Sequence, residues 1–226
     1  MCGRYSLAID YDAISDRFDL RGGVQLPLVY RDRFNIAPTQ EVLTVVNAAG
    51  QGNQPRMMRW GLVPFWAKDL SIGNRMVNAR AETIMESRVF RQAFQRCRCL
   101  VVADGFYEWR SQGKRRIPMR VILKTGEPFG LAGLWETWKS PEGKTIESCT
   151  IITTTPNELM ARIHNRMPVI LPREAETPWL DPENTDAGVL RELLVPYPAS
   201  EMDAYEVSTL VNSPKYDSPD LLARVG

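Results

Sequence analysis

The sequence predicts a single-domain α+β protein over residues 1–226, in which an antiparallel, partly barrel-like sheet is flanked by short helices. The chain has 226 residues, of which 44% are hydrophobic and 24% charged, so it has the length and apolar content for one sizeable core. From residue 99 onward, short apolar runs alternate with turn residues, as in consecutive antiparallel strands. Helical spacing is confined to short stretches, and no repeat or Gly/Ser linker divides the chain.

The N-terminal region predicts one short helix, over residues 10–20. Asp10 is a suitable N-cap, and Ile14 and Phe18 fall on one helical face. Gly22-Gly23 then breaks the helix.

A strand and a second helix are expected next. Residues 41–47 form an apolar, β-branched run that predicts a strand, followed by a turn that begins at Ala49-Gly50. Residues 81–95 have helical spacing, carried by Ile84, Phe90 and Phe94.

The middle of the chain predicts a series of strands in antiparallel order. The strands are expected at 99–103, 106–110, 117–124, 129–138 and 147–155. Turns are expected between them at 111–114, 125–126 and 140–143. Such a series favours a meander or a partly closed barrel.

Two helices and a strand complete the prediction. Residues 155–158 combine a threonine N-cap, a proline at the first helical position and a glutamate three residues after the cap. That helix is expected to end near Ile163, which places His164 just beyond it. Residues 186–195 predict another amphipathic helix, and 205–209 a last strand.

The charges of the chain are segregated, although the net charge is only +1. A net charge this small argues against a protein wrapped wholesale in nucleic acid. Residues 1–120, however, carry 19 basic and 11 acidic residues, whereas 121–226 carry 9 and 16. Of the 28 basic residues 22 are arginine, which suits bidentate phosphate binding, although codon bias accounts for the ratio equally well.

The composition also excludes several classes of protein. The apolar content excludes a disordered chain, and no apolar run is long enough to span a bilayer. No secretory signal is recognised at the start, so a cytoplasmic protein with reduced thiols is expected. With His164 as the one histidine, a site built from several histidines is excluded, and neither a metal nor a cofactor is expected. Three of the cysteines, Cys97, Cys99 and Cys149, are interpreted as core residues.

Cys2 is the first candidate for chemistry. Removal of the initiator methionine would leave it as the N-terminal residue. An N-terminal cysteine carries an α-amine with an ordinary pKa of about 7.7–8.0 beside a thiol near about 8.5, so both are nucleophiles near neutral pH. Such a 1,2-aminothiol condenses with an aldehyde to an imine, which the thiol closes to a thiazolidine. The alternative is a disordered terminus with an unremarkable cysteine.

Three further side chains could take part in proton transfer or positioning. Histidine titrates near neutral pH, so His164 is a candidate general acid or base, or else a structural or surface residue. Glu108 lies between aromatic residues, so it is either a partly desolvated proton acceptor or an edge-strand carboxylate that faces water. Asn78 precedes Arg80 by two residues, a motif that is weak in isolation.

An aromatic and basic stretch could bind nucleic acid. Residues 60–66 place Trp60, Phe65 and Trp66 around glycine and proline, and residues 56–120 carry 14 basic against 5 acidic residues. Single-stranded nucleic acid needs aromatic faces for its bases beside cations for its phosphates. The alternative is that these aromatic residues belong to the core, which we expect for Trp60.

Together these segments resemble one family, the SOS-response-associated peptidase (SRAP) proteins, which crosslink to abasic sites in single-stranded DNA. The resemblance is carried in order by seven segments: Met1-Cys2-Gly3-Arg4, Phe34-Asn35-Ile36-Ala37-Pro38, Trp60-Gly61-Leu62-Val63-Pro64, Asn78-Ala79-Arg80-Ala81-Glu82-Thr83, Ala103-Asp104-Gly105-Phe106-Tyr107-Glu108-Trp109, Ala132-Gly133-Leu134-Trp135-Glu136 and Ile163-His164-Asn165-Arg166-Met167-Pro168.

The resemblance implies a role for each candidate. Cys2 would crosslink to the ring-opened abasic site through a thiazolidine. Asn78 would position the sugar and the terminal amine, and Glu108 would orient that amine and accept its proton. His164 would protonate the deoxyribose ring oxygen and assist reversal. Abasic-site lyase action and removal of the residues that precede the cysteine are also implied.

The resemblance further implies a DNA-binding surface and a partner. The residues expected there are Arg4, Asn35, Pro38, Trp66, Arg80, Arg88 and Arg166. The expected partner is single-stranded DNA with abasic sites, bound by a monomer that is cytoplasmic and associates with the nucleoid at damaged DNA.

Two positions depart from the family pattern. Asn165 stands where the family often has aspartate, which would weaken the polarisation of His164. Ala67 follows Trp66 where many relatives carry a second aromatic residue, which would reduce base stacking.

Two other functions remain open at this point. N-terminal-nucleophile glutamine amidotransferases also begin Met-Cys-Gly, but they typically continue with an apolar residue where this chain has Arg4. A non-catalytic single-strand-binding module would use the arginines and tryptophans and would leave Cys2 incidental.

Overall fold

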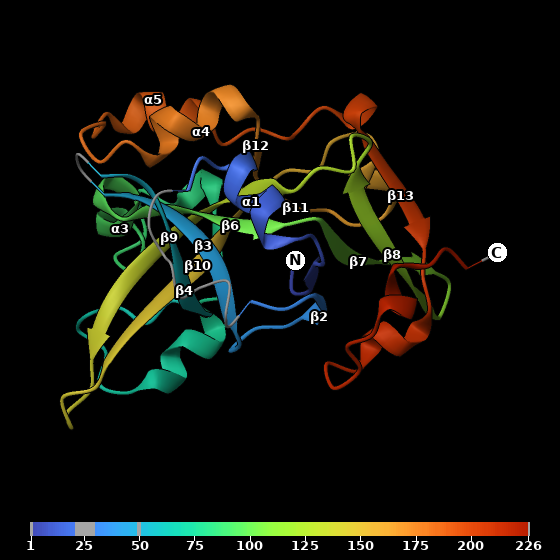
Figure 1. The fold of residues 1–226 in the computed structure, drawn as a ribbon, viewed down its shortest axis with the longest axis horizontal. Coiled ribbons are helices and arrows are strands. Elements are labelled where there is room, and N and C mark those ends of the chain that lie inside the picture. Colours follow the sequence, from blue (N-terminus) through green and yellow to red (C-terminus); the bar gives the residue numbers. More distant parts are fainter. Residues whose placement is uncertain (1, 21–29, 49–50, 226) are drawn as a thin grey trace.

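Two β-sheets form the frame of the molecule in the computed structural model, which describes residues 2–20, 30–48 and 51–225 (Figure 1). The first sheet has the order β13-β8-β7-β1-β2 and is antiparallel throughout. Its strands are β1 (Tyr5–Leu7), β2 (Arg33–Ile36), β7 (Gly105–Gln112), β8 (Arg115–Leu123) and β13 (Met202–Glu206).

The second sheet closes into a barrel. β10 pairs with both β4 and β9, and β3 and β6 complete the ring in the order β10-β4-β3-β6-β9. The short strands β5, β11 and β12 attach to β10 and β9. Only the pairings of β10 with β4 and with β5 are parallel among those described. The strands of this sheet are β3 (Glu41–Ala48), β4 (Gly52–Trp60), β5 (Asn78–Arg80), β6 (Arg98–Ala103), β9 (Phe129–Lys139), β10 (Thr145–Thr154), β11 (Met167–Pro168) and β12 (Ile170–Leu171).

The predicted α+β class with a partly barrel-like sheet is confirmed, and of the two arrangements left open, a meander or a partly closed barrel, the barrel is the one observed. β7 and β8 form a hairpin that leaves the barrel for the first sheet, and β6 pairs directly with β9. Sequence order is therefore interrupted where the two sheets meet. The last strand, expected at 205–209, begins and ends three residues earlier.

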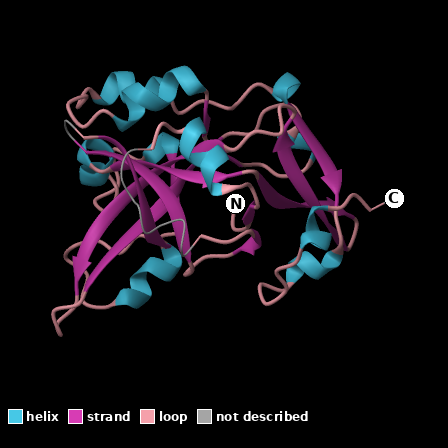
Figure 2. Cartoon of the chain, viewed as in Figure 1, coloured by secondary structure: helices cyan, strands magenta, loops and turns pink. Residues whose placement is uncertain are grey.

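Short helices lie around the outside of the strands (Figure 2). The α-helices are α1 (Tyr11–Arg17), α3 (Arg91–Arg96), α4 (Arg173–Leu180) and α5 (Ala187–Glu192). The 3₁₀ helices are Leu70–Arg75, Ala81–Thr83, Met160–Arg162, Ala199–Glu201, Thr209–Asn212 and Pro219–Leu222. Among the described residues, no helix combines the length and apolar character needed to cross a bilayer.

The two helices that were predicted close to their observed positions, α1 and α5, both begin after an aspartate that caps them. Asp10 accepts a hydrogen bond from Asp12 N at the start of α1, as predicted, and Asp186, whose capping role was not predicted, accepts from Gly188 N at the start of α5. Gly22-Gly23 and Ala49-Gly50, the predicted helix break and turn, lie outside the described residues.

Two predicted helices are wrong in extent. Residues 81–95 form a 3₁₀ turn, a bend and then α3, because Ser87 Oγ accepts from Val89 N and Phe90 N and starts a new turn in mid-segment. The helix expected from Thr155 is a single 3₁₀ turn, capped by Asn157 Oδ1 on Met160 N at 2.9 Å. The short α4 was not predicted.

Most apolar side chains pack into one core inside and around the barrel, which includes the fully buried Trp60 and Trp179. Cys99 and Cys149 are wholly buried in that core and Cys97 packs against it, all three as free thiols, as predicted. A smaller cluster around Tyr107 packs the first sheet against the C-terminal segment. The strand β1, which follows Cys2, lies close to the point where the two sheets meet (Figure 1).

Candidate active site and nucleic-acid surface

Cys2 lies three residues before β1 of the first sheet and is wholly buried. The pairing of Tyr5 with Phe106, and the hydrogen bond from Tyr107 N to Arg4 O at 2.9 Å, run the N-terminal segment alongside β7. Burial, and then the nearby Glu108 carboxylate, raise the pKa of the Cys2 thiol well above its ordinary range. Cys2 is therefore a positioned, protonated thiol and not a disordered terminal residue.

Asn78 connects Cys2 to the barrel. It is the first residue of β5, which lies parallel to β10 with Asn78 opposite Ile151. Its Nδ2 donates a hydrogen bond of 2.8 Å to Cys2 O. Its Oδ1 is buried and accepts no hydrogen bond from the part of the chain that the structure describes, so it can accept one from a ligand.

Glu108 and His164 form a close pair beside Cys2. Glu108 lies on β7 and is 3% exposed, and its Oε1 is 3.9 Å from Nδ1 of His164. His164 follows the 3₁₀ turn Met160–Arg162, and its Nδ1 lies 3.1 Å from the donor Arg166 N. In a neutral ring whose Nδ1 accepts this hydrogen bond, the proton is on Nε2. The four predicted catalytic residues thus meet at the junction of the two sheets.

An open hollow of about 450 Å³ gives access to this pair. It is lined by Glu108, His164, Trp109, Arg116 and Asn212. Sequence reasoning missed the last three. Trp109 adjoins Glu108 in the chain, so the same motif could have identified it. Arg116 comes from the return strand β8 and Asn212 from the 3₁₀ turn Thr209–Asn212, and neither segment carries a local signal.

Arg4 is held at the edge of this hollow by buried groups. Its Nη1 donates to Asn35 Oδ1 at 2.7 Å and to Val211 O at 2.6 Å, and its guanidinium lies over the Trp109 ring at 5.8 Å. Asn35 is fully buried, and its Nδ2 donates to the carbonyl oxygens of three C-terminal residues, the shortest bond being 2.7 Å to Tyr216 O. Asn35 thus positions Arg4, and its burial leaves it no exposed surface for a direct DNA contact.

Arg80 and Arg166 lie at the same end of β10. Arg80 is exposed and pairs with Thr153 across the strands, and Arg166 Nη2 donates to Thr153 O at 2.7 Å. Arg166 also forms a bidentate ion pair with Glu82, at 2.6 and 2.9 Å. These hydrogen bonds hold the pKa of the Glu82 carboxyl below its usual range.

Trp66 and Arg88 meet at a second, smaller hollow of about 230 Å³. The Trp66 side chain is half exposed, and Arg88 is exposed beside it. Pro38 is half-buried between β2 and β3 and lines neither hollow. The predicted DNA-binding residues are thus distributed over several surface segments, and their contact with DNA remains a prediction.

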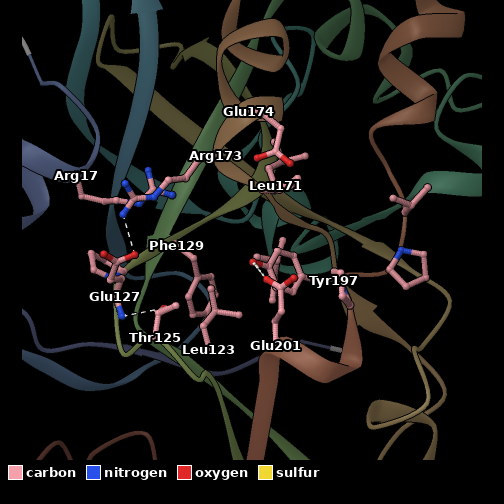
Figure 3. Close-up of a pocket in the computed structure, with 16 residues that line it drawn as sticks. Arg17, Leu123, Thr125, Glu127, Phe129, Leu171, Arg173, Glu174, Tyr197 and Glu201 are labelled. Carbon is pink, nitrogen blue, oxygen red and sulfur yellow. Dashed lines mark hydrogen bonds and ion pairs between the residues drawn. The ribbon is translucent and has the colours of Figure 1, made fainter.

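Another hollow of about 450 Å³ lies between β12 and the segment before Ala199–Glu201 and shares no residue with the predicted site (Figure 3). Its lining combines the apolar side chains of Leu123, Phe129 and Leu171 with carboxylates that include Glu174 and Glu201. Its arginines are already paired, Arg173 with Glu127 and Arg17 with Glu176. The remaining carboxylates disfavour a phosphate ligand.

Within the described ranges, no three or more His, Cys, Asp or Glu side chains are grouped as a metal site would require.

Comparison with known proteins shows the family to which the chain belongs. The family model described as SOS response associated peptidase (SRAP) matches residues 1–214. The chain is 50% identical over 224 residues to the abasic site processing protein YoqW of Bacillus subtilis (strain 168), covering 98% of this chain and 99% of that protein. It is 30% identical over 276 residues to the abasic site processing protein HMCES of Rattus norvegicus, covering 99% and 76%.

A solved structure shares the fold. A crystal structure of a protein from Bacteroides thetaiotaomicron superposes with a TM-score of 0.90 at 28% identity, covering 99% of this chain and all of that one. The extent of the family match and the identity to full-length relatives confirm the resemblance found in the sequence. The chain belongs to the SOS response associated peptidase (SRAP) family.

Proposed function

We propose that this protein processes abasic sites in single-stranded DNA by forming a covalent link to them through Cys2, and so shields the lesion. The observation that carries the proposal is the convergence of Cys2, Asn78, Glu108 and His164 from four separate segments at one junction. The relatives named above are called abasic site processing proteins, which supports the same substrate.

The first step is condensation of an amine with an aldehyde. After removal of Met1, the Cys2 α-amine attacks the C1′ aldehyde of the ring-opened deoxyribose, and loss of one water gives an imine. Glu108 accepts the proton that the amine releases as the C–N bond forms. Asn78 Nδ2 fixes the Cys2 carbonyl at 2.8 Å, and its Oδ1 accepts from the amine or a sugar hydroxyl.

The second step closes the ring. The Cys2 sulfur adds to the imine carbon, the C=N electron pair moves to nitrogen, and nitrogen takes up the proton that the thiol loses. The product is a thiazolidine, and the net loss over both steps is one water. Because burial and Glu108 disfavour the thiolate, the thiol closes the ring intramolecularly once the imine is formed instead of competing with the amine.

His164 acts before and after these steps. In its imidazolium form the ring donates one proton to the deoxyribose ring oxygen and is left neutral, while the C1′ hydroxyl gives up its proton to solvent and the aldehyde is exposed; the reverse transfer assists release. The imine also permits lyase action, in which a C2′ proton is removed and the 3′ phosphate leaves. Removal of residues before Cys2 by the same groups accounts for the peptidase in the family name.

The strand is held by cations on several surface segments. Arg4, Arg80, Arg88 and Arg166 supply phosphate contacts, and Trp66 supplies an exposed ring for a base. Asn35 contributes by holding Arg4.

The test is to incubate the protein with single-stranded DNA that contains one abasic site and to separate the products on a denaturing gel. We expect a covalent adduct with the wild type, none with Cys2→Ala, and none with undamaged DNA. Cys97→Ala, which removes a half-buried cysteine at the end of α3, is the matched control and keeps the adduct.

Two results would overturn the proposal. Absence of an adduct from protein with a verified Cys2 terminus excludes the covalent mechanism. Release of ammonia from glutamine in stoichiometric amounts, without an adduct, identifies an amidotransferase instead.

A further inference from the structure

Two adjacent aromatic rings are exposed at the surface between β4 and β5. Phe65 is 57% exposed and Trp66 is 52% exposed. Within the described ranges the other exposed large hydrophobic side chains are aliphatic, and no two of them are adjacent in the sequence. Exposed rings that lie side by side on a soluble protein mark a binding surface.

The segment that carries the two rings is fixed to the barrel at alternate residues. Val63 N donates to Ser148 Oγ at 2.8 Å, Phe65 N donates to Glu136 Oε2 at 3.0 Å, and Ala67 O accepts from Trp138 Nε1 at 2.8 Å.

The start of the same segment is closely packed. A Cβ at Gly61, where φ is +125°, would lie 2.6 Å from Gly73 O. The rings are therefore held outward on a rigid support, which reduces the entropy lost when they bind a ligand.

The hollow beside the rings combines a cation with a buried carboxylate. Phe65 and Trp66 form one wall, exposed Arg88 stands at the rim, and Glu136 of β9 lies at the base with only 8% of its surface exposed. At about 230 Å³ the hollow is below the usual size of a drug-like site, so it suits one planar ring. Phe65 N occupies one acceptor position of the carboxylate, which has about four.

These groups match the parts of one nucleotide. A flat aromatic face stacks on a base, and a guanidinium binds the adjoining phosphate. A buried carboxylate repels phosphate but accepts a hydrogen bond from an exocyclic amine, as glutamate does from cytosine N4. Thymine presents no such amine.

We propose that Phe65, with Trp66, stacks on an undamaged base of the bound strand, and that Glu136 accepts a hydrogen bond from the exocyclic amine of that base, which favours cytosine over thymine. The subsite rests on the proposed binding of single-stranded DNA and adds a base preference to it. It also supplies, from position 65, the second aromatic ring that the departure at Ala67 removes from position 67.

The experiment measures the affinity of the full-length protein for short oligodeoxycytidine and oligothymidine of equal length, without abasic sites and at one salt concentration. Wild type is expected to bind oligodeoxycytidine more tightly. Phe65→Ala is expected to weaken binding to both by about 5-fold or more, and Phe65→Tyr, which keeps a ring, to retain it. Glu136→Gln keeps an acceptor for Phe65 N and is expected to bring the ratio of the two affinities close to unity.

The matched control is Val195→Ala, an equally exposed side chain at the hollow of Figure 3, which is expected to bind like wild type. Thermal unfolding of each variant verifies that it is folded. Equal affinities of wild type for the two oligomers, unchanged binding by folded Phe65→Ala, or an unchanged ratio in folded Glu136→Gln each overturn the subsite. The adduct assay distinguishes the two proposals. If the wild type forms adducts but any of these results is found, only the subsite proposal fails. If the wild type forms no adduct, the proposed function fails.

Discussion

The side-chain amide of Asn78 donates a hydrogen bond of 2.8 Å to the main-chain carbonyl of Cys2. The bond joins the N-terminal segment of the first sheet to the barrel strand β5 and so fixes the direction of the reactive terminus. Positioning of this kind is worth large factors in rate, because a small displacement of a nucleophile removes it from its attack geometry.

Replacement of Asn78 is therefore expected to slow adduct formation more than it affects folding. Asn78→Ala and Asn78→Asp both lose the donor, and each is expected to lower the single-turnover rate by about 10- to 100-fold. Asn74→Ala, at an exposed asparagine four residues earlier, is the control. If Asn78→Ala and Asn78→Asp react as fast as the control Asn74→Ala, the hydrogen bond has no part in positioning Cys2.

Glu108 is expected to have opposite effects on two reactions of Cys2. Because its carboxylate contributes to the raised pKa of the thiol, Glu108→Gln should lower that pKa, increase the thiolate fraction at a given pH and speed alkylation of Cys2. The same variant should slow adduct formation, because the proton acceptor for the amine is lost.

The measurement is iodoacetamide labelling of Cys2 followed by peptide mass spectrometry from neutral pH to about pH 9, above the ordinary thiol pKa of about 8.5. In wild type the rate should still be rising at the upper limit, because the raised pKa delays ionisation. A plateau near neutral pH in wild type, or slower labelling of Glu108→Gln, would contradict this assignment.

Arg116 is expected to bind a phosphate at the hollow beside Glu108 and His164. Arg116→Gln should weaken binding of single-stranded DNA and reduce the slope of log affinity against log salt by about 0.7. Arg115→Gln is a matched control, since neighbouring residues of a strand point to opposite faces and Arg115 does not line the hollow. Equal slopes for the two variants would place Arg116 outside the DNA interface.

Asn35 is expected to act through Arg4. Asn35→Ala removes the amide that bonds Arg4 and three carbonyl oxygens, while the bond from Arg4 to Val211 O remains, so unfolding free energy should fall by about 1–3 kcal/mol. DNA affinity should fall as well, because Arg4 loses its position. If DNA affinity falls in folded Asn35→Ala but not in Arg4→Gln, the effect of Asn35 does not pass through Arg4.

The sequence predicts an element correctly where neighbouring residues in the chain determine it. Asp10 and Asp186 cap their helices because an aspartate side chain satisfies the first backbone N–H groups wherever the chain turns. The helix expected at 155–163 is shortened to one 3₁₀ turn, and in the segment before it Asn157, two residues after the predicted cap, accepts from Met160 N through its Oδ1. The division of the strands between two sheets depends on pairings between distant segments, which no local pattern carries.

The site residues divide in the same way, into those that a local motif identifies and those that only the fold brings to the site. Cys2, Asn78, Glu108 and His164 each lie in a short motif, so the sequence could name them, and the structure adds that they are neighbours. Arg116 and Asn212 enter the site only through the hairpin return and the C-terminal turn. Asn35 was expected at the DNA, but its burial and its bond to Arg4 come from packing that the motif does not reveal.

The central claim is that Cys2 forms a thiazolidine with an abasic site, and the intact mass of the adduct tests it most directly. We predict that the wild type, without reductant, gives a species whose mass is that of the protein from Cys2 onward plus the abasic strand minus one water, and which survives denaturation. Cys2→Ala keeps an α-amine but has no thiol to close the ring, so its adduct should appear only when borohydride traps the imine. An adduct of Cys2→Ala that is equally stable without borohydride, or no adduct at all from the wild type, would contradict the account.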